Sequence, residues 1–340
     1  MESMNKKITI TDVAEALQIS KTTVSRAISG NGRISEETRK KVLDYIEEKD
    51  YKPNFIAKSL AQSKTYNIAM VIPGDCDLVE MPFFQHSMQG ICEEAFKKGY
   101  DVMLVTMKEG DLSNLIRVID HHKVDGVILS RSFVKDKAAV LLLEKEIPFV
   151  LMGTSKQEGI LQVDNNHEEA CRALVENMME NGIGRIGLIG GDTDFVVNRA
   201  RLRGFKKAYR QEKRELEKGL VYDNCESYLQ VERAVVALCE KNAECIVCMD
   251  DRICSQVLQV LDKKKIAVPS QMKVASFYDS TLLKNHEPAI TSLRFDDKAL
   301  GRLTCSVLID RLQGKEVTSR NLLGFEIVYR KSTERKEEHA

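Results

Sequence analysis

The sequence contains no tryptophan, few aromatic residues (6%), and no uninterrupted apolar stretch long enough to cross a bilayer. A membrane-spanning helix, which needs about 18 such residues, is therefore excluded. The first ten residues are polar and lack the apolar core of a secretory signal, so we expect a cytoplasmic protein. Net charge is absent as well, because 51 basic and 51 acidic side chains balance. This balance argues against a general polyanion binder.

Nine cysteines are scattered through apolar segments. Without a secretory signal, they indicate reduced thiols rather than a disulfide framework. Cys245 and Cys248 have C-x-x-C spacing, but they lie inside an apolar run whose alternate residues face opposite sides of a strand. No serine–histidine–aspartate arrangement or carboxylate pair indicates catalysis. We therefore predict no enzyme activity, no metal and no cofactor.

Three short helical patterns occupy the first fifty residues. Apolar residues recur at helical spacing over 11–17 and 21–28, and Ser20 is the expected N-cap of the second helix. A third helix is predicted from the Ser35 cap to about Lys49. Residues 1–65 carry 12 basic and 9 acidic side chains, so this segment has an excess of three positive charges that the remainder balances. Such an asymmetry permits a nucleic-acid contact near the N-terminus.

The pattern changes from Tyr66 onward, where short β-runs alternate with helical segments. The order predicts a doubly wound parallel sheet. A similar alternation follows in the second half, so we expect two α/β lobes with a ligand cleft between them. The fold class is thus an all-α N-terminal module followed by a two-lobed, doubly wound α/β domain.

Residues 10–28 fit a helix-turn-helix. The small Ala14 would let the second helix pack closely, and Val24 would fill the gap between the helices. Side chains on the outer face of this helix could reach base edges or phosphates in the major groove. They are Lys21, Thr22, Ser25 and Arg26.

Further motifs extend this pattern: Asp12-Val13-Ala14, then 20–26 (S-K-T-T-V-S-R), 34–42 (I-S-E-E-T-R-K-K-V) and 51–60 (Y-K-P-N-F-I-A-K-S-L). With them, the segment from Ile8 to Thr65 resembles the N-terminal region of lac-repressor/gal-repressor (LacI) family regulators. The resemblance implies a sequence-specific DNA-binding transcriptional repressor. It would act as a homodimer on double-stranded palindromic operator DNA and respond to a small-molecule effector.

The resemblance also implies which residues contact DNA. The recognition helix would read the major groove, the start of the third helix would hold phosphates, and a short hinge helix would enter the minor groove. Leu60 would be the wedge between base pairs, which fits an apolar side chain without a core of its own. The full predicted set is Ser20, Lys21, Thr22, Ser25, Arg26, Arg33, Ser35, Asn54, Ala57 and Leu60.

The remaining chain is similar, more loosely, to the type I periplasmic-binding-protein fold. The resemblance implies effector contacts at Phe83, Phe84, Arg201, Asp250, Asp279 and Phe295. Arginine and carboxylates suit a polyhydroxylated ligand in a dry cleft. Core packing of the two adjacent phenylalanines and a helix-start ion pair for the arginine remain alternatives.

The effector's identity does not follow from the family, because Asp250 and Gly153 stand where relatives often carry other residues. A sugar or sugar phosphate is the first expectation. A nucleobase is second, since no tryptophan and few aromatic residues could stack on a planar ring.

The expected boundaries are a helix-turn-helix domain over 1–50, a hinge over 51–65 and an effector-binding and dimerisation domain over 66–335. Within that domain, the first lobe would comprise about 66–163 and 293–330, and the second about 164–292. The C-terminal residues lack a leucine heptad, so a dimer is expected rather than a tetramer. A solute-binding protein and an enzyme on the same fold are the competing functions. The former would need a signal peptide and no N-terminal module, and the latter a catalytic constellation.

Overall fold

The computed structural model describes residues 8–29, 32–51, 59, 62–75, 81–108 and 110–334. The chain divides into two compact units, Met1–Thr65 and Tyr66–Ala340, which we call the headpiece and the body. Within the described ranges, no helix is both long and apolar enough to cross a membrane.

The headpiece contains three helices, α1 (Ile10–Ala16), α2 (Lys21–Ser29) and α3 (Glu36–Glu48). Each begins at a hydroxyl side chain that caps the backbone: Thr9 for α1, Ser20 for α2 and Ser35 for α3. The buried core of this unit consists of Val13, Ala14, Val24, Ala27, Val42 and Tyr51. The predicted packing of Ala14 and Val24 between the helices is confirmed.

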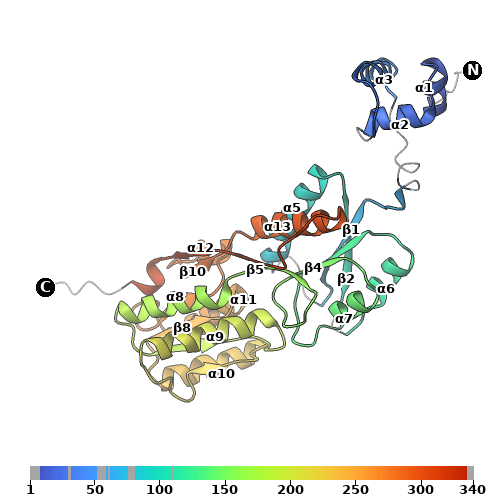
Figure 1. Cartoon of the computed structure of the whole chain (residues 1–340). Coiled ribbons are helices and arrows are strands. Elements are labelled where there is room, and N and C mark those ends of the chain that lie inside the picture. Colours follow the sequence, from blue (N-terminus) through green and yellow to red (C-terminus); the bar gives the residue numbers. More distant parts are fainter. Residues whose placement is uncertain are drawn as a thin grey trace, which may run out of the picture. The chain divides into compact units, whose positions relative to one another are not determined.

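The first lobe of the body is a six-stranded parallel sheet in the order β11-β5-β4-β3-β1-β2. Its strands are β1 (Asn67–Pro73), β2 (Asp101–Met107), β3 (Gly126–Leu129), β4 (Phe149–Met152), β5 (Leu161–Asn165) and β11 (Arg320–Leu323). Helices α5 (Pro82–Lys97) and α13 (Asp297–Leu312) cover one face, and α6 (Ser113–Asp120) and α7 (Lys137–Glu144) the other (Figure 1). Because both faces are covered, β1 is a continuous buried apolar run.

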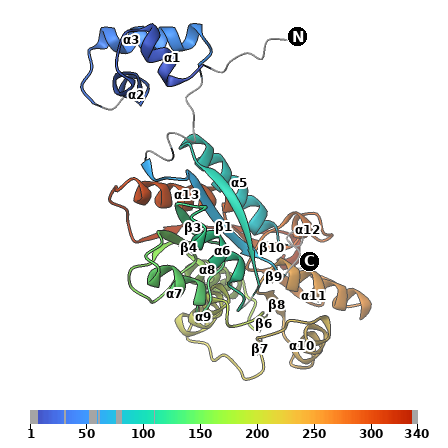
Figure 2. The same ribbon diagram turned by 90° about the vertical axis from the view of Figure 1, so that its right-hand side faces the viewer.

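The second lobe repeats this architecture around the sheet β12-β10-β9-β8-β6-β7, and Figure 2 shows β6 to β9 side by side. Its strands are β6 (Ile186–Ile189), β7 (Val221–Tyr222), β8 (Cys245–Cys248), β9 (Lys273–Ser276), β10 (Thr291–Arg294) and β12 (Glu326–Val328). Its helices are α8 (His167–Glu180), α9 (Val196–Gln211), α10 (Tyr228–Glu240), α11 (Asp251–Lys263), α12 (Thr281–Lys284) and the 3₁₀ turn η2 (Lys331–Thr333). The predicted fold class is confirmed. Cys245 and Cys248 lie fully buried in the core strand β8.

Each lobe contains a pair of helices whose backbones touch at a glycine residue. A Cβ atom on Gly301 of α13 would lie 2.1 Å from the Ser87 carbonyl oxygen of α5, and one on Gly90 would lie 2.1 Å from the Lys298 oxygen. In the second lobe, a Cβ on Gly204 of α9 would lie 2.3 Å from the Glu168 oxygen of α8. These helices pack so closely that no side chain fits between them.

The chain crosses between the lobes three times, after β5, after β10 and after β11. The predicted extent of the first lobe, to about residue 330, is therefore wrong at its end. After β11, the chain returns to the second sheet, where β12 pairs antiparallel with β10. The predicted switch at 293 is also slightly early, since β10 continues to Arg294 in the second sheet. The physical reason is that β12 is a short edge strand, and only its pairing with β10 places it in the second sheet.

Candidate functional site

Helix α2 turns one face toward solvent. Val24 and Ala27 are buried against α1 and α3, whereas the predicted recognition residues Lys21, Thr22, Ser25 and Arg26 are all exposed. This exposure follows from the helical period, because the two buried positions lie on the opposite side of the helix. The face is thus available to a large partner without any rearrangement of the core.

Three further predicted DNA-contacting residues, Ser20, Arg33 and Ser35, lie just before α2 and α3 in the sequence. Ser20 and Ser35 are exposed, and each hydroxyl accepts the backbone N–H three residues later, from Thr23 and Thr38, at 3.1 Å. Arg33 is exposed just before α3. The hydroxyls of Ser20 and Ser35 therefore have a structural role as helix caps, and a DNA contact would be additional to it.

Three of the predicted DNA contacts, Asn54, Ala57 and Leu60, lie outside the described residues. Their assignment to a hinge helix in the minor groove stays a prediction.

The body contains a cavity of about 420 Å³ between its two lobes. The first lobe contributes the ends of its strands and the start of α5, and the second lobe contributes the starts of α8, α9 and α11. Four of the predicted effector-binding residues line it: Phe83, Phe84, Arg201 and Asp250. This position beyond the strand ends is the usual ligand site of doubly wound folds.

Among the described residues that line the cavity, Arg201 is the only buried arginine, with 7% of its surface exposed. Its Nη1 donates to the Met249 carbonyl oxygen at 2.8 Å, and its Nε has no hydrogen-bond partner among the described residues. A buried donor without a partner is costly, so this geometry favours an acceptor supplied from outside the protein.

Three further buried atoms at the cavity lack a hydrogen-bond partner within the described part of the chain: Asn165 Oδ1, His167 Nδ1 and Asp297 Oδ1. Burial lowers the pKa of His167, which keeps the ring neutral near pH 7. Sequence reasoning missed all three, because each stands where a strand ends or a helix begins and resembles ordinary turn chemistry. Together with Arg201, they provide donors and acceptors suited to a ligand rich in hydroxyl groups.

Carboxyl groups outnumber guanidinium groups in the cavity wall. Burial, reinforced by neighbouring Asp250, raises the pKa of Asp251 to about 6, and burial raises that of Asp297 to about 6. Tyr278 from the second lobe donates its hydroxyl to Asp297 Oδ2 at 2.5 Å. The acidic lining residues are Asp75, Asp164, Asp192, Glu226, Asp250, Asp251 and Asp297, and the basic ones are Arg131, Arg201 and Arg252.

Replacing Asp297 by asparagine should stabilise the protein at pH 8 but not at pH 4.5. The folded carboxyl group keeps its proton up to about pH 6, whereas the unfolded chain ionises near 3.8, so the protein loses stability as the pH rises between these values. The amide still accepts from Tyr278 and carries no charge. We expect thermal denaturation to show a gain on the order of 5 °C at pH 8.

The matched control for this experiment is Asp262→Asn, which removes an exposed carboxyl group of α11. It should leave the melting temperature unchanged at both pH values. An equal gain from Asp297→Asn at pH 4.5 and pH 8 would contradict the assignment to a buried charge.

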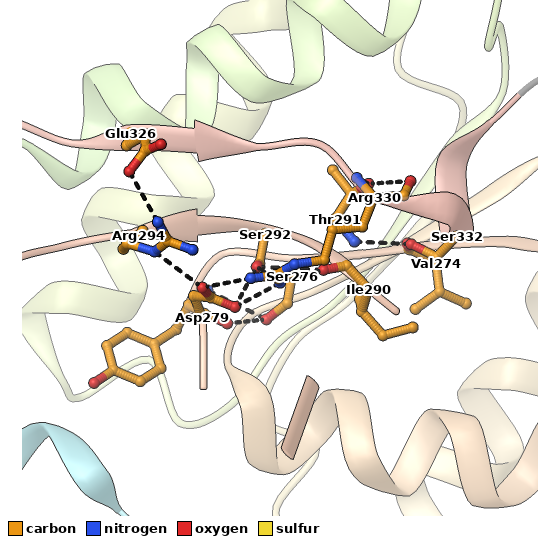
Figure 3. A network of polar contacts seen from close by, with 11 residues as sticks. Val274, Ser276, Asp279, Ile290, Thr291, Ser292, Arg294, Glu326, Arg330 and Ser332 are labelled. Atoms are coloured by element: carbon orange, nitrogen blue, oxygen red, sulfur yellow. Dashed lines mark hydrogen bonds and ion pairs between the residues drawn. The ribbon is translucent and has the colours of Figure 1, made fainter. Parts of the chain in front are cut away.

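Two predicted effector contacts do not reach the cavity. Asp279 points away from it and binds Arg330, whose Nη1 and Nη2 donate to its carboxylate at 2.7 and 2.8 Å (Figure 3). Ser292 and Arg294 of β10 also donate to Asp279. The preceding residue, Tyr278, lines the cavity instead. The error is one position, because successive side chains of an extended segment point to opposite sides.

Phe295 is likewise buried behind the cavity wall. Its ring packs edge-on against His167, with 4.7 Å between the ring centroids. It therefore holds a lining residue in place and does not itself line the cavity.

The lobes also contact each other at a pair of loops. Val134 N donates to the Asp194 carbonyl oxygen at 3.0 Å, and Val196 N donates to the Ser132 oxygen at 3.1 Å. Both Ser132 and Phe195, within these loops, line the cavity. These two hydrogen bonds therefore join the lobes directly, in addition to the three segments that cross between them.

Comparisons with known proteins match both units. Residues 9–54 match the family model for bacterial regulatory proteins of the lacI family, and residues 175–333 match that for a periplasmic binding protein-like domain. The HTH-type transcriptional regulator MalR of Streptococcus pneumoniae is 28% identical over 333 residues, covering 94% of this chain and 99% of its own. Catabolite control protein A of Staphylococcus xylosus is 25% identical, covering 96% and 99%.

A solved structure extends these matches to the whole fold. The complex of the transcriptional regulator CelR with cellobiose is 26% identical, with a TM-score of 0.72, and the alignment covers 96% of this chain and 99% of that one. The headpiece and the body are thus matched together, in the same order along the chain.

Proposed function

Because the chain belongs to the LacI family of regulators and carries a periplasmic-binding-protein-like body, we propose that it is an effector-controlled transcriptional repressor acting in the cytoplasm. Two copies would place their α2 helices in successive major grooves of a palindromic operator. The relatives are transcriptional regulators, and we infer that this chain catalyses no reaction. The observation that carries the DNA-binding role is the exposed face of α2 above a fully packed headpiece core.

The effector would bind in the cavity of the body. Support comes from the four buried polar atoms without partners, which a ligand with several hydroxyl groups would satisfy. CelR, which shares this fold, was solved with cellobiose. We therefore propose a sugar or sugar phosphate as the effector, with Phe83 and Phe84 covering its apolar faces.

The switch would act through the angle between the lobes. A ligand that bridges Arg201 of the second lobe and Asp297 of the first would favour one angle, and the hinges of a dimer would respond. The coupling is reciprocal, so operator DNA must change the affinity for the effector by the same factor.

DNA binding is tested by selecting an operator from a random duplex library and titrating it at several salt concentrations. We expect affinity to fall steeply with salt, because phosphate contacts release counterions. Arg26→Ala should weaken operator binding by at least about tenfold, through the loss of a base contact in each half-site. Fluorescence anisotropy with labelled operator measures both effects.

The matched control removes an exposed lysine from the body, Lys156→Ala, and should leave operator affinity unchanged. Affinity for the selected operator that does not depend on salt would refute the proposal. Thermal-shift screening with sugars and sugar phosphates tests the effector, and any compound that binds is then added to the operator titration.

A further inference from the structure

The charge of the cavity wall restricts the chemistry of the ligand. Seven carboxyl groups face three guanidinium groups, which leaves four formal negative charges around about 420 Å³. Arg131 is already paired with Asp75, its Nη1 lying 3.1 Å from the carboxylate. Arg252 is exposed, so Arg201 is the basic group that a ligand deep in the cavity would meet.

The positive charge of Arg201 is itself compensated. It lies close enough to Asp251 and Asp297 to lower the pKa of both, although burial outweighs this effect and raises each to about 6. Above that pH, the two carboxylates together carry more charge than the guanidinium. Arg201 can therefore donate hydrogen bonds to hydroxyl oxygens, but it offers no surplus positive charge for a phosphate dianion.

Helix N-termini are the other common phosphate sites, and at this cavity two of them carry aspartate pairs. Asp250 accepts Ile253 N at 2.8 Å at the start of α11, and Asp251 follows in its first turn. Asp296 accepts Ala299 N at 2.8 Å at the start of α13, and Asp297 follows. The carboxylates occupy the positions where a phosphate would bind, so the dipoles of these two helices are already neutralised. Helices α5 and α9 also begin at the cavity and carry no acidic residue in their first turns, but Pro82 of α5 has no N–H and Val196 N of α9 already donates to the Ser132 oxygen.

We propose that the cavity takes an unphosphorylated sugar and rejects the corresponding phosphate ester. This inference rests on the proposed function and narrows its effector class. Hydroxyl groups can donate to Asp297 Oδ1 and Asn165 Oδ1 and accept from Arg201 Nε, which satisfies the atoms that lack partners. A phosphate would instead add about two negative charges to an acidic, partly buried site.

The test uses matched pairs of compounds on the full-length protein: glucose, maltose and cellobiose, each against its 6-phosphate ester. Isothermal titration calorimetry at pH 7.5 measures binding. We expect at least one parent sugar to bind, and its ester to bind at least about tenfold more weakly. An ester that binds more tightly than its parent would overturn the inference and leave the proposed repressor intact. If no compound of either kind binds, the sugar effector itself is refuted, and this inference with it.

A substitution tests whether the carboxyl groups of the cavity cause the preference for the parent sugar over its phosphate ester. Asp251→Asn removes one negative charge beside Arg201 and should reduce the preference for the parent sugar at least about threefold. Asp262→Asn removes an exposed carboxyl group from the same helix and should leave the preference unchanged. Equal preferences in both variants and the unmodified protein would show that charge at this wall does not select the ligand.

Discussion

Replacing Gly301 by alanine is expected to destabilise the body by about 3 kcal/mol or more. The new methyl group would lie 2.1 Å from the Ser87 carbonyl oxygen, and this neighbour is backbone of α5 rather than a flexible side chain. Helices α5 and α13 would have to separate along one whole face of the first sheet. Thermal denaturation followed by circular dichroism should show a melting temperature lower by about 10 °C.

Gly324→Ala provides the control, because a Cβ at that position meets nothing within 4 Å. Its melting temperature should equal that of the unmodified protein. If Gly301→Ala also melts within about 2 °C of the unmodified protein, the close helix contact does not exist in solution. Gly90→Ala, which tests the same contact from α5, should behave like Gly301→Ala.

Replacing Arg330 by methionine is expected to cost about 3–5 kcal/mol of stability, since it leaves Asp279 half-buried without its main partner. Arg330 donates to both oxygens of Asp279, to the Ile290 carbonyl oxygen at 2.6 Å and to Ser292 Oγ at 2.9 Å. Figure 3 shows this network joining β10 to the segment that follows β12. Urea denaturation at pH 7 measures the loss.

The pH dependence follows from the pKa of Asp279. Burial alone would raise it, but the hydrogen bonds from Arg330 and Ser292 outweigh burial and lower it below 3.8. The ion pair therefore stabilises the protein at pH values above the ordinary pKa of aspartate, and this stabilisation is lost as the pH falls through the lowered pKa of Asp279. The difference between Arg330→Met and the unmodified protein should shrink as the pH falls below 3.8, the ordinary pKa of an aspartate.

The double variant Asp279→Leu/Arg330→Met serves as the internal control. Replacing a buried pair by apolar side chains is often nearly neutral, so we expect most of the lost stability to return. A double variant as unstable as Arg330→Met alone would contradict the pairing as the source of the stability.

The three helices of the headpiece, α1 to α3, could be predicted from sequence almost residue by residue. Its helix starts are encoded locally by Ser20 and Ser35, and its buried positions follow from helical spacing. The strand–helix alternation of the body was equally clear, because strands covered on both faces are continuous apolar runs.

The cavity was only partly predictable. Arg201 follows from the resemblance of the body to the periplasmic-binding-protein fold, but the choice between Tyr278 and Asp279 depends on which side of the chain faces the other lobe. Asn165, His167 and Asp297 are candidate ligand contacts because each has a buried polar atom without a hydrogen-bond partner among the described residues. This property can be recognised only in the packed structure. The pairing of β12 with β10 likewise depends on a strand over thirty positions earlier in the chain.

The three crossings between the lobes have a consequence for synthesis on the ribosome. The first lobe lacks α13 and β11 until Leu323 has been made, although β1 to β5 are complete by Asn165. The second lobe lacks β12 and η2 until Thr333. During translation, the part of the first sheet that α13 covers therefore stays exposed until α13 has been made, and each lobe gains its last edge strand only near the end of the described chain. We therefore expect neither lobe to complete its native structure before the other, in contrast to domains that fold one after another.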